Sequence, residues 1–202
     1  MTSRPFVSHA STILDQVSMR AASAGAWTGV QVLSVLFVTV CTAAAAQVSF
    51  PLPFTPIPFS TQDVTVLIGG AALGSTLGAL SQILYLMAGV VGLPVFANAP
   101  ELPQGAARLL GPTGGYLMAF PIAAFVTGWL AERGFDRRYL TSILAMTVGL
   151  AIILFGGVAW ISRATGVPAA LAAGFYPFVA IDVIKVIAAG SVLPTAWKFL
   201  KP

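Results

Sequence analysis

The sequence predicts an all-α integral membrane protein, a single bundle of six transmembrane helices. Of its 202 residues only 8% are charged and 57% are hydrophobic, and the mean hydropathy is +0.92. A soluble domain of this length has no core large enough to hide so much apolar surface. The charges also leave long uncharged runs, which hold segments of the roughly 20 residues that a helix needs to cross a bilayer.

These runs divide into six expected helices. The second and third come from one long run, which small residues interrupt between Gly74 and Gln82. We expect residues 25–202 to form the bundle and residues 1–24 to form a cytoplasmic tail or interfacial helix. In chain order the expected helices are Trp27–Val48, Asp63–Leu80, Ser81–Val95, Gly114–Ala131, Tyr139–Ser162 and Ala169–Trp197.

The connection after the first helix, PLPFTPIPFSTQD, contains four prolines. Proline fixes φ and removes a backbone donor, so no regular helix crosses this segment and we expect a structured loop. Ser60 and Thr61 are plausible caps for the helix that follows. The helix dipole accounts for Asp63 in the first turn of that helix.

Lysine and arginine counts in the short connections predict the orientation. If the N-terminus is cytoplasmic, the outer loops carry only Arg108 and Arg163, and Lys185 lies within a helix. The other seven basic residues are then cytoplasmic: Arg4, Arg20, Arg133, Arg137, Arg138, Lys198 and Lys201. Both termini are therefore expected in the cytoplasm, and the net charge of +4 reflects topology and not nucleic-acid binding.

Several kinds of chemistry are excluded by composition. Cys41 is the only cysteine and His9 the only histidine, so we expect no internal disulfide, no metal site and no Ser/His hydrolase in the membrane part. The segment GPTGGYL, residues 111–117, lacks the Gly-Lys-Ser/Thr ending of a P-loop. Its glycines allow either close helix packing or a polar ligand at backbone N–H groups.

One pair of charges lies inside an apolar segment. Asp182 and Lys185 are three residues apart and share a helix face. A charge at mid-bilayer costs about 3 kcal/mol on insertion scales, and ionisable residues inside spans usually mark functional sites. The pair is either a ligand site for a small polar molecule or a structural salt bridge.

The ordered motifs resemble those of the BioY family, the biotin-binding S components of energy-coupling-factor (ECF) vitamin transporters. The matching pieces are PFTPIPFSTQ, GLPVFA, GPTGGYL and the D-x-x-K of the last helix, and they cover nearly the whole chain after the tail. NAPELPQG, residues 98–105, departs from the usual glycine-rich stretch after GLPVFA.

The resemblance implies an outward-facing cavity that captures biotin, covered by the loops after helices one and three. Asn98, Asp182 and Lys185 are then the expected polar contacts, because they can meet the ureido N–H groups, the carbonyl or the carboxylate. The sequence leaves open which end of biotin meets which residue. Aromatic cover is expected from Phe96, Tyr116, Tyr176 and Phe178.

The resemblance also implies partners and a location. A member of this family would be a transport subunit and not an enzyme, with biotin as its transported ligand and no cofactor, and this chain carries no motif that binds ATP. Uptake would require a transmembrane coupling subunit and two cytoplasmic ATPase subunits in a bacterial cytoplasmic membrane. A small-residue face on the first helix would dock them: Thr39, Ala43, Ala44 and Ala45. Ala43→Trp is expected to impair uptake and leave biotin binding intact.

Three alternatives remain open at this point. The chain could bind another vitamin, or it could be a membrane scaffold with a structural Asp182–Lys185 pair. An intramembrane aspartyl protease is the third alternative, and it needs two carboxylates in one site. With Asp63 assigned to helix capping and Glu101 and Glu132 to loops, no second carboxylate is expected.

Overall fold

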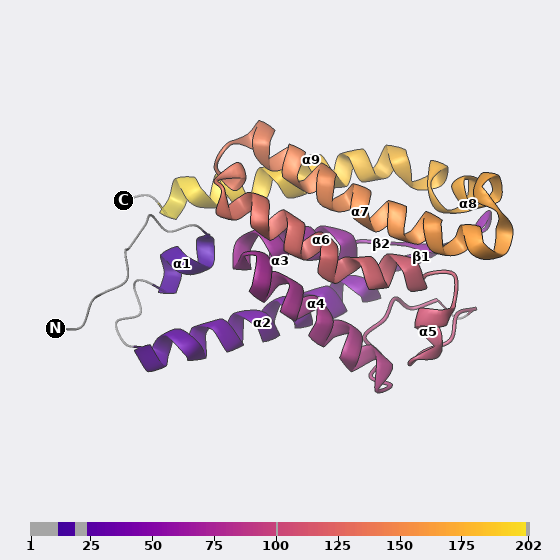
Figure 1. Cartoon of the computed structure of the whole chain (residues 1–202), viewed down its shortest axis with the longest axis horizontal. Helices are drawn as coiled ribbons and strands as arrows, with labels where there is room; N and C mark the ends of the chain where they lie inside the picture. The colour runs from indigo at the N-terminus through magenta and orange to yellow at the C-terminus, as the bar shows by residue number, and fades with distance from the viewer. Residues whose placement is uncertain (1–11, 19–23, 100, 201–202) are drawn as a thin grey trace.

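The computed structural model describes residues 12–18, 24–99 and 101–200, and it is mostly helical (Figure 1). His9 and most of the expected cytoplasmic tail lie outside these residues. The long or bundle-forming helices are α2 Ala24–Gln47, α3 Gln62–Leu73, α4 Ser75–Val90, α6 Gly114–Glu132, α7 Tyr139–Thr165 and α9 Tyr176–Leu200. The short elements are α1 Ile13–Ser18, β1 Ser49–Leu52, β2 Thr55–Ser60, α5 Ala107–Leu110, η1 Phe135–Arg137 and α8 Val167–Gly174.

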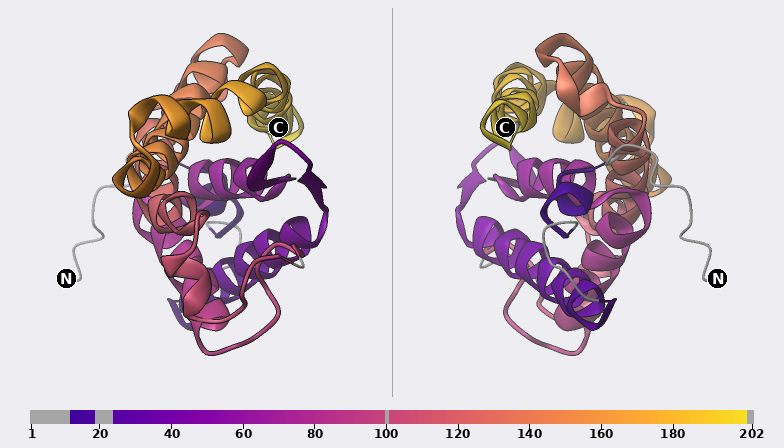
Figure 2. Two further views of the ribbon diagram at one scale, coloured as in Figure 1. Left: turned by 90° about the vertical axis from the view of Figure 1, so that its right-hand side faces the viewer. Right: turned by 90° about the vertical axis from the view of Figure 1, so that its left-hand side faces the viewer.

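The helices form an elongated bundle around α6, which packs against α3, α4 and α7. The start of α2, the end of α9 and η1 lie at one end, whereas the β1–β2 hairpin, α5 and α8 lie at the other (Figure 1). α1 packs against α2 and α3 near the first end (Figure 2). The main core is shared by α3, α4, α6, α7 and α9.

Six transmembrane helices were expected, and four helices of the described residues are long and apolar enough to cross a membrane. These four are α2, α6, α7 and α9. α3 and α4 are shorter, with 12 and 16 residues. At about 1.5 Å per residue, α3 spans only about 18 Å.

The break between α3 and α4 falls at Gly74 and not at Leu80, which corrects the expected boundary. Gly74 has a φ of +88°, a conformation that side chains other than glycine rarely adopt. The carboxylate of Glu132, at the end of α6, accepts from the Ser75 backbone N at 2.7 Å and from the Ser75 hydroxyl at 2.8 Å. These bonds satisfy a free backbone N–H at the start of α4. They also fix the position of the break, which the local run of small residues does not specify.

The proline-rich connection is a β-hairpin, in which β1 pairs with β2 in antiparallel register. It stands along the side of the bundle between α2 and α9 (Figure 2). Thr61 is the N-cap residue of α3, but its hydroxyl makes no capping bond and donates instead to the Ala45 carbonyl at 3.1 Å. The expected capping role of the Ser60 and Thr61 side chains is therefore wrong.

The last expected helix, Ala169–Trp197, is two helices. α8 ends at Gly174, and α9 begins at Tyr176 with Pro177 in its first turn, where a missing backbone N–H costs nothing. The hydroxyls of Thr55 and Tyr116 donate to the carbonyls of Ala173 and Gly174, both at 2.7 Å. The end of α8 is thus tied to the hairpin and to α6, which positions the start of α9.

Candidate functional site

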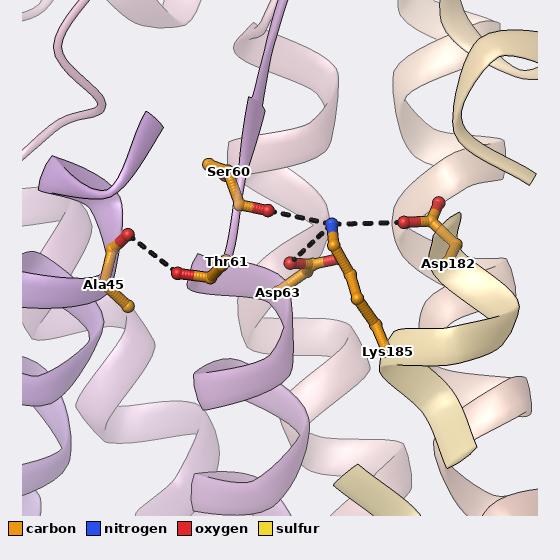
Figure 3. Close-up of polar contacts among 6 residues, drawn as sticks. All are labelled: Ala45, Ser60, Thr61, Asp63, Asp182 and Lys185. Carbon is orange, nitrogen blue, oxygen red and sulfur yellow. Dashed lines mark hydrogen bonds and ion pairs between the residues drawn. The ribbon is translucent and has the colours of Figure 1, made fainter. Parts of the chain in front are cut away.

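The ammonium of Lys185 lies at the centre of a charged cluster between α9 and the junction of β2 with α3 (Figure 3). Its Nζ donates to the Ser60 carbonyl at 2.8 Å and to the two carboxylate oxygens of Asp63 at 3.0 and 3.2 Å. The Oδ1 of Asp182 lies 3.1 Å from the same nitrogen. One ammonium therefore faces two carboxylates and a backbone carbonyl.

This cluster is largely removed from solvent. The exposed fractions of the Lys185, Asp63 and Asp182 side chains are 12%, 13% and 4%. The Phe59 ring covers the ammonium at 4.4 Å from its centroid. Buried charges are tolerated when they are paired and hydrogen-bonded, and here the two carboxylates and one ammonium leave a local charge of −1.

The cluster lines a cavity whose remaining walls are mostly apolar, with contributions from the hairpin, α3, α6, α7 and α9. Besides the three charged residues, the lining residues are Ile57, Pro58, Ser60, Gln62, Ala97, Arg108, Thr113, Tyr116, Leu117, Phe120, Leu150, Ile153, Leu154 and Phe178. A mostly apolar cavity with a few polar points is typical of a small-molecule site.

Arg108, from α5, supplies a second cation to the cavity wall. The residue is only 1% exposed, and its Nη2 donates to the Ala97 carbonyl at 2.8 Å. Within the described residues it has no carboxylate partner, and its Nε is buried without a hydrogen bond. Burial lowers the pKa of the Arg108 guanidinium, and the neighbouring Tyr85 acts in the opposite direction. This side chain has unused capacity to bind an anion.

Four of the seven residues expected to bind ligand lie together on the cavity wall: Tyr116, Phe178, Asp182 and Lys185. The other three do not line it. Phe96 belongs to the core, where its ring meets Tyr85 edge to face at 5.6 Å. Asn98 is exposed and its carbonyl accepts from Ser49, whereas Tyr176 is 65% exposed at the start of α9.

Gln62, Asp63 and Arg108 also line the cavity, although none of them was predicted as a ligand contact from the sequence. Gln62 is the last residue of the motif PFTPIPFSTQ, and its place in that motif could have indicated a position in the site. Asp63 lies in the first turn of α3 as expected, but its side chain pairs with Lys185 of α9 in the cavity wall. Arg108 entered only the count of charges in the loops, because its burial depends on the packing of α5.

The expected absence of a second carboxylate is also wrong, because Asp63 and Asp182 converge on the same nitrogen. A protease dyad requires two carboxylates that share a proton directly. Here the Lys185 ammonium lies between them and neutralises one charge, so the arrangement does not match that of a dyad.

The four small residues of α2 differ in accessibility. The hydroxyl of Thr39 is buried against α4, where it donates to the Ser81 carbonyl at 2.9 Å. Ala43 packs partly buried against the main core, and Ala45 is half-buried. Only Ala44 is exposed, so Thr39 does not fit an exposed docking face.

Comparisons with known proteins agree with this architecture. A biotin transporter BioY of Thermotoga maritima is 38% identical over 68% of this chain and 79% of its own length. A probable biotin transporter BioY of Pyrococcus horikoshii is 40% identical over 76% of this chain and 86% of its own length. The crystal structure of the S-component for biotin from an ECF-type ABC transporter superposes with a TM-score of 0.77 at 24% identity, over 88% of this chain and 95% of that one. The BioY family model matches residues 18–202, and the chain belongs to the BioY family.

Proposed function

We propose that this chain is the biotin-binding and uptake subunit of an ECF-type transporter. The observation that carries the proposal is the buried cluster of Asp63, Lys185 and Asp182 in the wall of an apolar cavity. The names of the relatives identify biotin transporters, and the cavity supplies the chemistry that such a ligand needs.

Biotin has a polar ring, an apolar body and a charged end, and the cavity offers a partner for each. The ureido ring has two N–H donors and one carbonyl, which match the Asp182 carboxylate and the Lys185 ammonium. Tyr116, Phe178 and Leu117 supply apolar cover. Arg108 is the proposed partner for the carboxylate, because it is the lining cation without an acidic partner among the described residues. Binding and release require no covalent chemistry, so we propose a transport subunit and not an enzyme.

The proposed setting is a bacterial cytoplasmic membrane crossed by six helices, with both termini in the cytoplasm. The start of α2 and the end of α9 lie at one end of the bundle, which supports termini on one side (Figure 1). The hairpin and α5 lie at the opposite end and would face outward. α3 is too short to cross the bilayer alone, and β2 directly precedes it in the chain. We propose that β2 also lies at membrane depth, where non-helical backbone is tolerated if it lines a cavity.

Titration of the purified chain with biotin tests the proposed function. We expect saturable binding of one biotin per chain by calorimetry. Biotin methyl ester should bind at least about tenfold more weakly, because it cannot form the charge-assisted contact with Arg108. Thiamine serves as the control ligand. Tight binding of thiamine with no binding of biotin would assign the site to another vitamin, and equal affinity for biotin and its ester would contradict the role of Arg108.

ATP-driven uptake would depend on a transmembrane coupling subunit and two cytoplasmic ATPase subunits, docked on α2. The exposed side of α2 carries a row of apolar residues that continues to Ala44: Leu33, Phe37 and Val40. Because Ala43 packs against the core, Ala43→Trp is expected to disturb the fold as well as docking. Ala44 is the better position for a test.

Ala44→Trp is expected to reduce biotin uptake by cells at least about fivefold, since a new side chain on a packed interface costs about 1–3 kcal/mol. Binding of biotin by the purified variant should stay within about twofold of the parent. Phe155→Trp, at a 72% exposed position of α7, is the control and should change neither quantity. Uptake at the parental rate in Ala44→Trp would place the docking face elsewhere.

A further inference from the structure

We infer that Asp63 is a positioning residue for the ligand: it holds the Lys185 ammonium on the β2–α3 side of the cavity and so leaves Asp182 able to accept a hydrogen bond from a ligand N–H. This inference rests on the proposed function and extends it to a residue outside the D-x-x-K pair. The two carboxylates that face the same nitrogen therefore have different roles: Asp63 positions Lys185, and Asp182 accepts from the ligand.

The two carboxylates are not equivalent in their contacts. Asp63 accepts hydrogen bonds from Lys185 through both oxygens, and the Ser60 carbonyl beside it accepts a third. An ammonium has three donors, and the two oxygens of one carboxylate can share a single N–H. Asp63 and Ser60 can therefore hold the ammonium and still leave one donor for a ligand. Asp182 contacts Lys185 through Oδ1 alone, at 3.1 Å, as an ion pair without a hydrogen bond.

Removing the Asp63 carboxylate would change which acceptor the Lys185 ammonium contacts. Asp182 and Lys185 lie three residues apart on one face of α9, so an ammonium freed from Asp63 would turn to its helical neighbour. It would then occupy an oxygen that the ligand needs. In addition, the local charge of the cluster would change from −1 to zero.

The change in charge makes the inference testable with two ligands. Biotin has a neutral ureido ring, whereas in iminobiotin an imino group replaces the ureido oxygen and the ring is cationic at neutral pH. A cluster with a charge of −1 favours the cationic ring relative to a neutral cluster. A purely structural role of Asp63 would weaken both ligands in proportion.

We therefore expect Asp63→Asn to weaken biotin binding about tenfold, the loss typical of a hydrogen bond to a charged group. The ratio of the iminobiotin Kd to the biotin Kd should rise at least a further tenfold or so. Asp63→Glu retains the charge and should keep the parental ratio. Asp136→Asn is the matched control, because Asp136 is a buried carboxylate on η1, outside the cavity lining. It should leave the ratio unchanged.

A double-mutant cycle supplies a second test that does not depend on Asp63→Asn folding alone. If Asp63 acts only through Lys185, its removal in a Lys185→Met background should change the biotin Kd less than about threefold. A ratio unchanged in Asp63→Asn, or a further large loss in the Lys185→Met background, would overturn the inference. A parent chain that binds neither ligand would refute the proposed function and this inference with it, whereas a parent that binds both with an unchanged ratio in the variant would refute this inference alone.

Discussion

Lys185→Met is expected to weaken biotin binding at least about 100-fold. The substitution removes the donor proposed for the ligand and leaves two buried carboxylates, Asp63 and Asp182, facing each other without a cation. Loss of a hydrogen bond from a charged donor costs up to about 3 kcal/mol, and about 2.7 kcal/mol corresponds to 100-fold in affinity. Calorimetry on the purified variant measures the loss, and a gel-filtration profile checks that the protein remains folded.

A triple variant separates the binding role of this cluster from a structural one. Replacing all three charges, with Asp63→Leu, Asp182→Leu and Lys185→Met, leaves no unpaired charge, and such replacements are often neutral for stability. We expect a folded protein that binds no biotin. If the triple variant unfolds while the Asp136→Asn control does not, the cluster is needed for the fold itself, which is the structural alternative for the Asp182–Lys185 pair. Biotin binding by a folded triple variant would remove this cluster from the ligand site.

Gly128→Val is expected to have the largest effect on stability. Gly128 faces the break between α3 and α4, and a Cβ at this position would lie 2.5 Å from the Ser75 backbone N and 2.7 Å from the Gly70 carbonyl oxygen. These are backbone atoms of a packed junction, so they cannot move aside as a flexible side chain would. Overpacking of this kind costs about 3 kcal/mol, which lowers the Tm by about 10 °C for a chain of this size.

Gly29→Val is the matched control, because Gly29 lies in α2 and, apart from its chain neighbours and its own helix backbone, no described atom lies within 4 Å of its Cβ position. The Tm of this variant should stay within about 2 °C of the parent, since exposed substitutions rarely change stability by more than about 0.5 kcal/mol. Equal Tm values for the two variants in detergent would contradict the close packing of α6 against the α3–α4 break.

The charged cluster joins two parts of the chain that are far apart in sequence. Ser60 and Asp63 lie where the hairpin meets α3, and Lys185 belongs to α9. The hairpin is also fastened to α8 through Thr55 and to the loop after α4 through Ser49. Lys185 therefore links α9 directly to a hairpin that lines one side of the cavity.

The sequence by itself determined the class of protein and the approximate bounds of α2, α6 and α7, but not the breaks between α3 and α4 or between α8 and α9. Low charge and long apolar runs set the helical membrane architecture, because a bilayer requires apolar segments of a minimum length. The motifs and the D-x-x-K pair pointed to the BioY family, and the pair lies on the cavity wall together with Tyr116 and Phe178. These signals are local in sequence, so a single segment was enough to find each of them.

Only the tertiary structure decided which other side chains share the site. Asp63 fits a helix start equally well whether or not a lysine lies opposite, and that lysine is 122 residues away. Likewise, aromatic character alone did not separate Phe96, in the core, from Phe178, on the cavity wall. The break at Gly74 depends on Glu132, and the burial of Arg108 depends on the packing of α5. Each outcome depends on long-range contacts, which the periodicity and composition of a single segment do not encode.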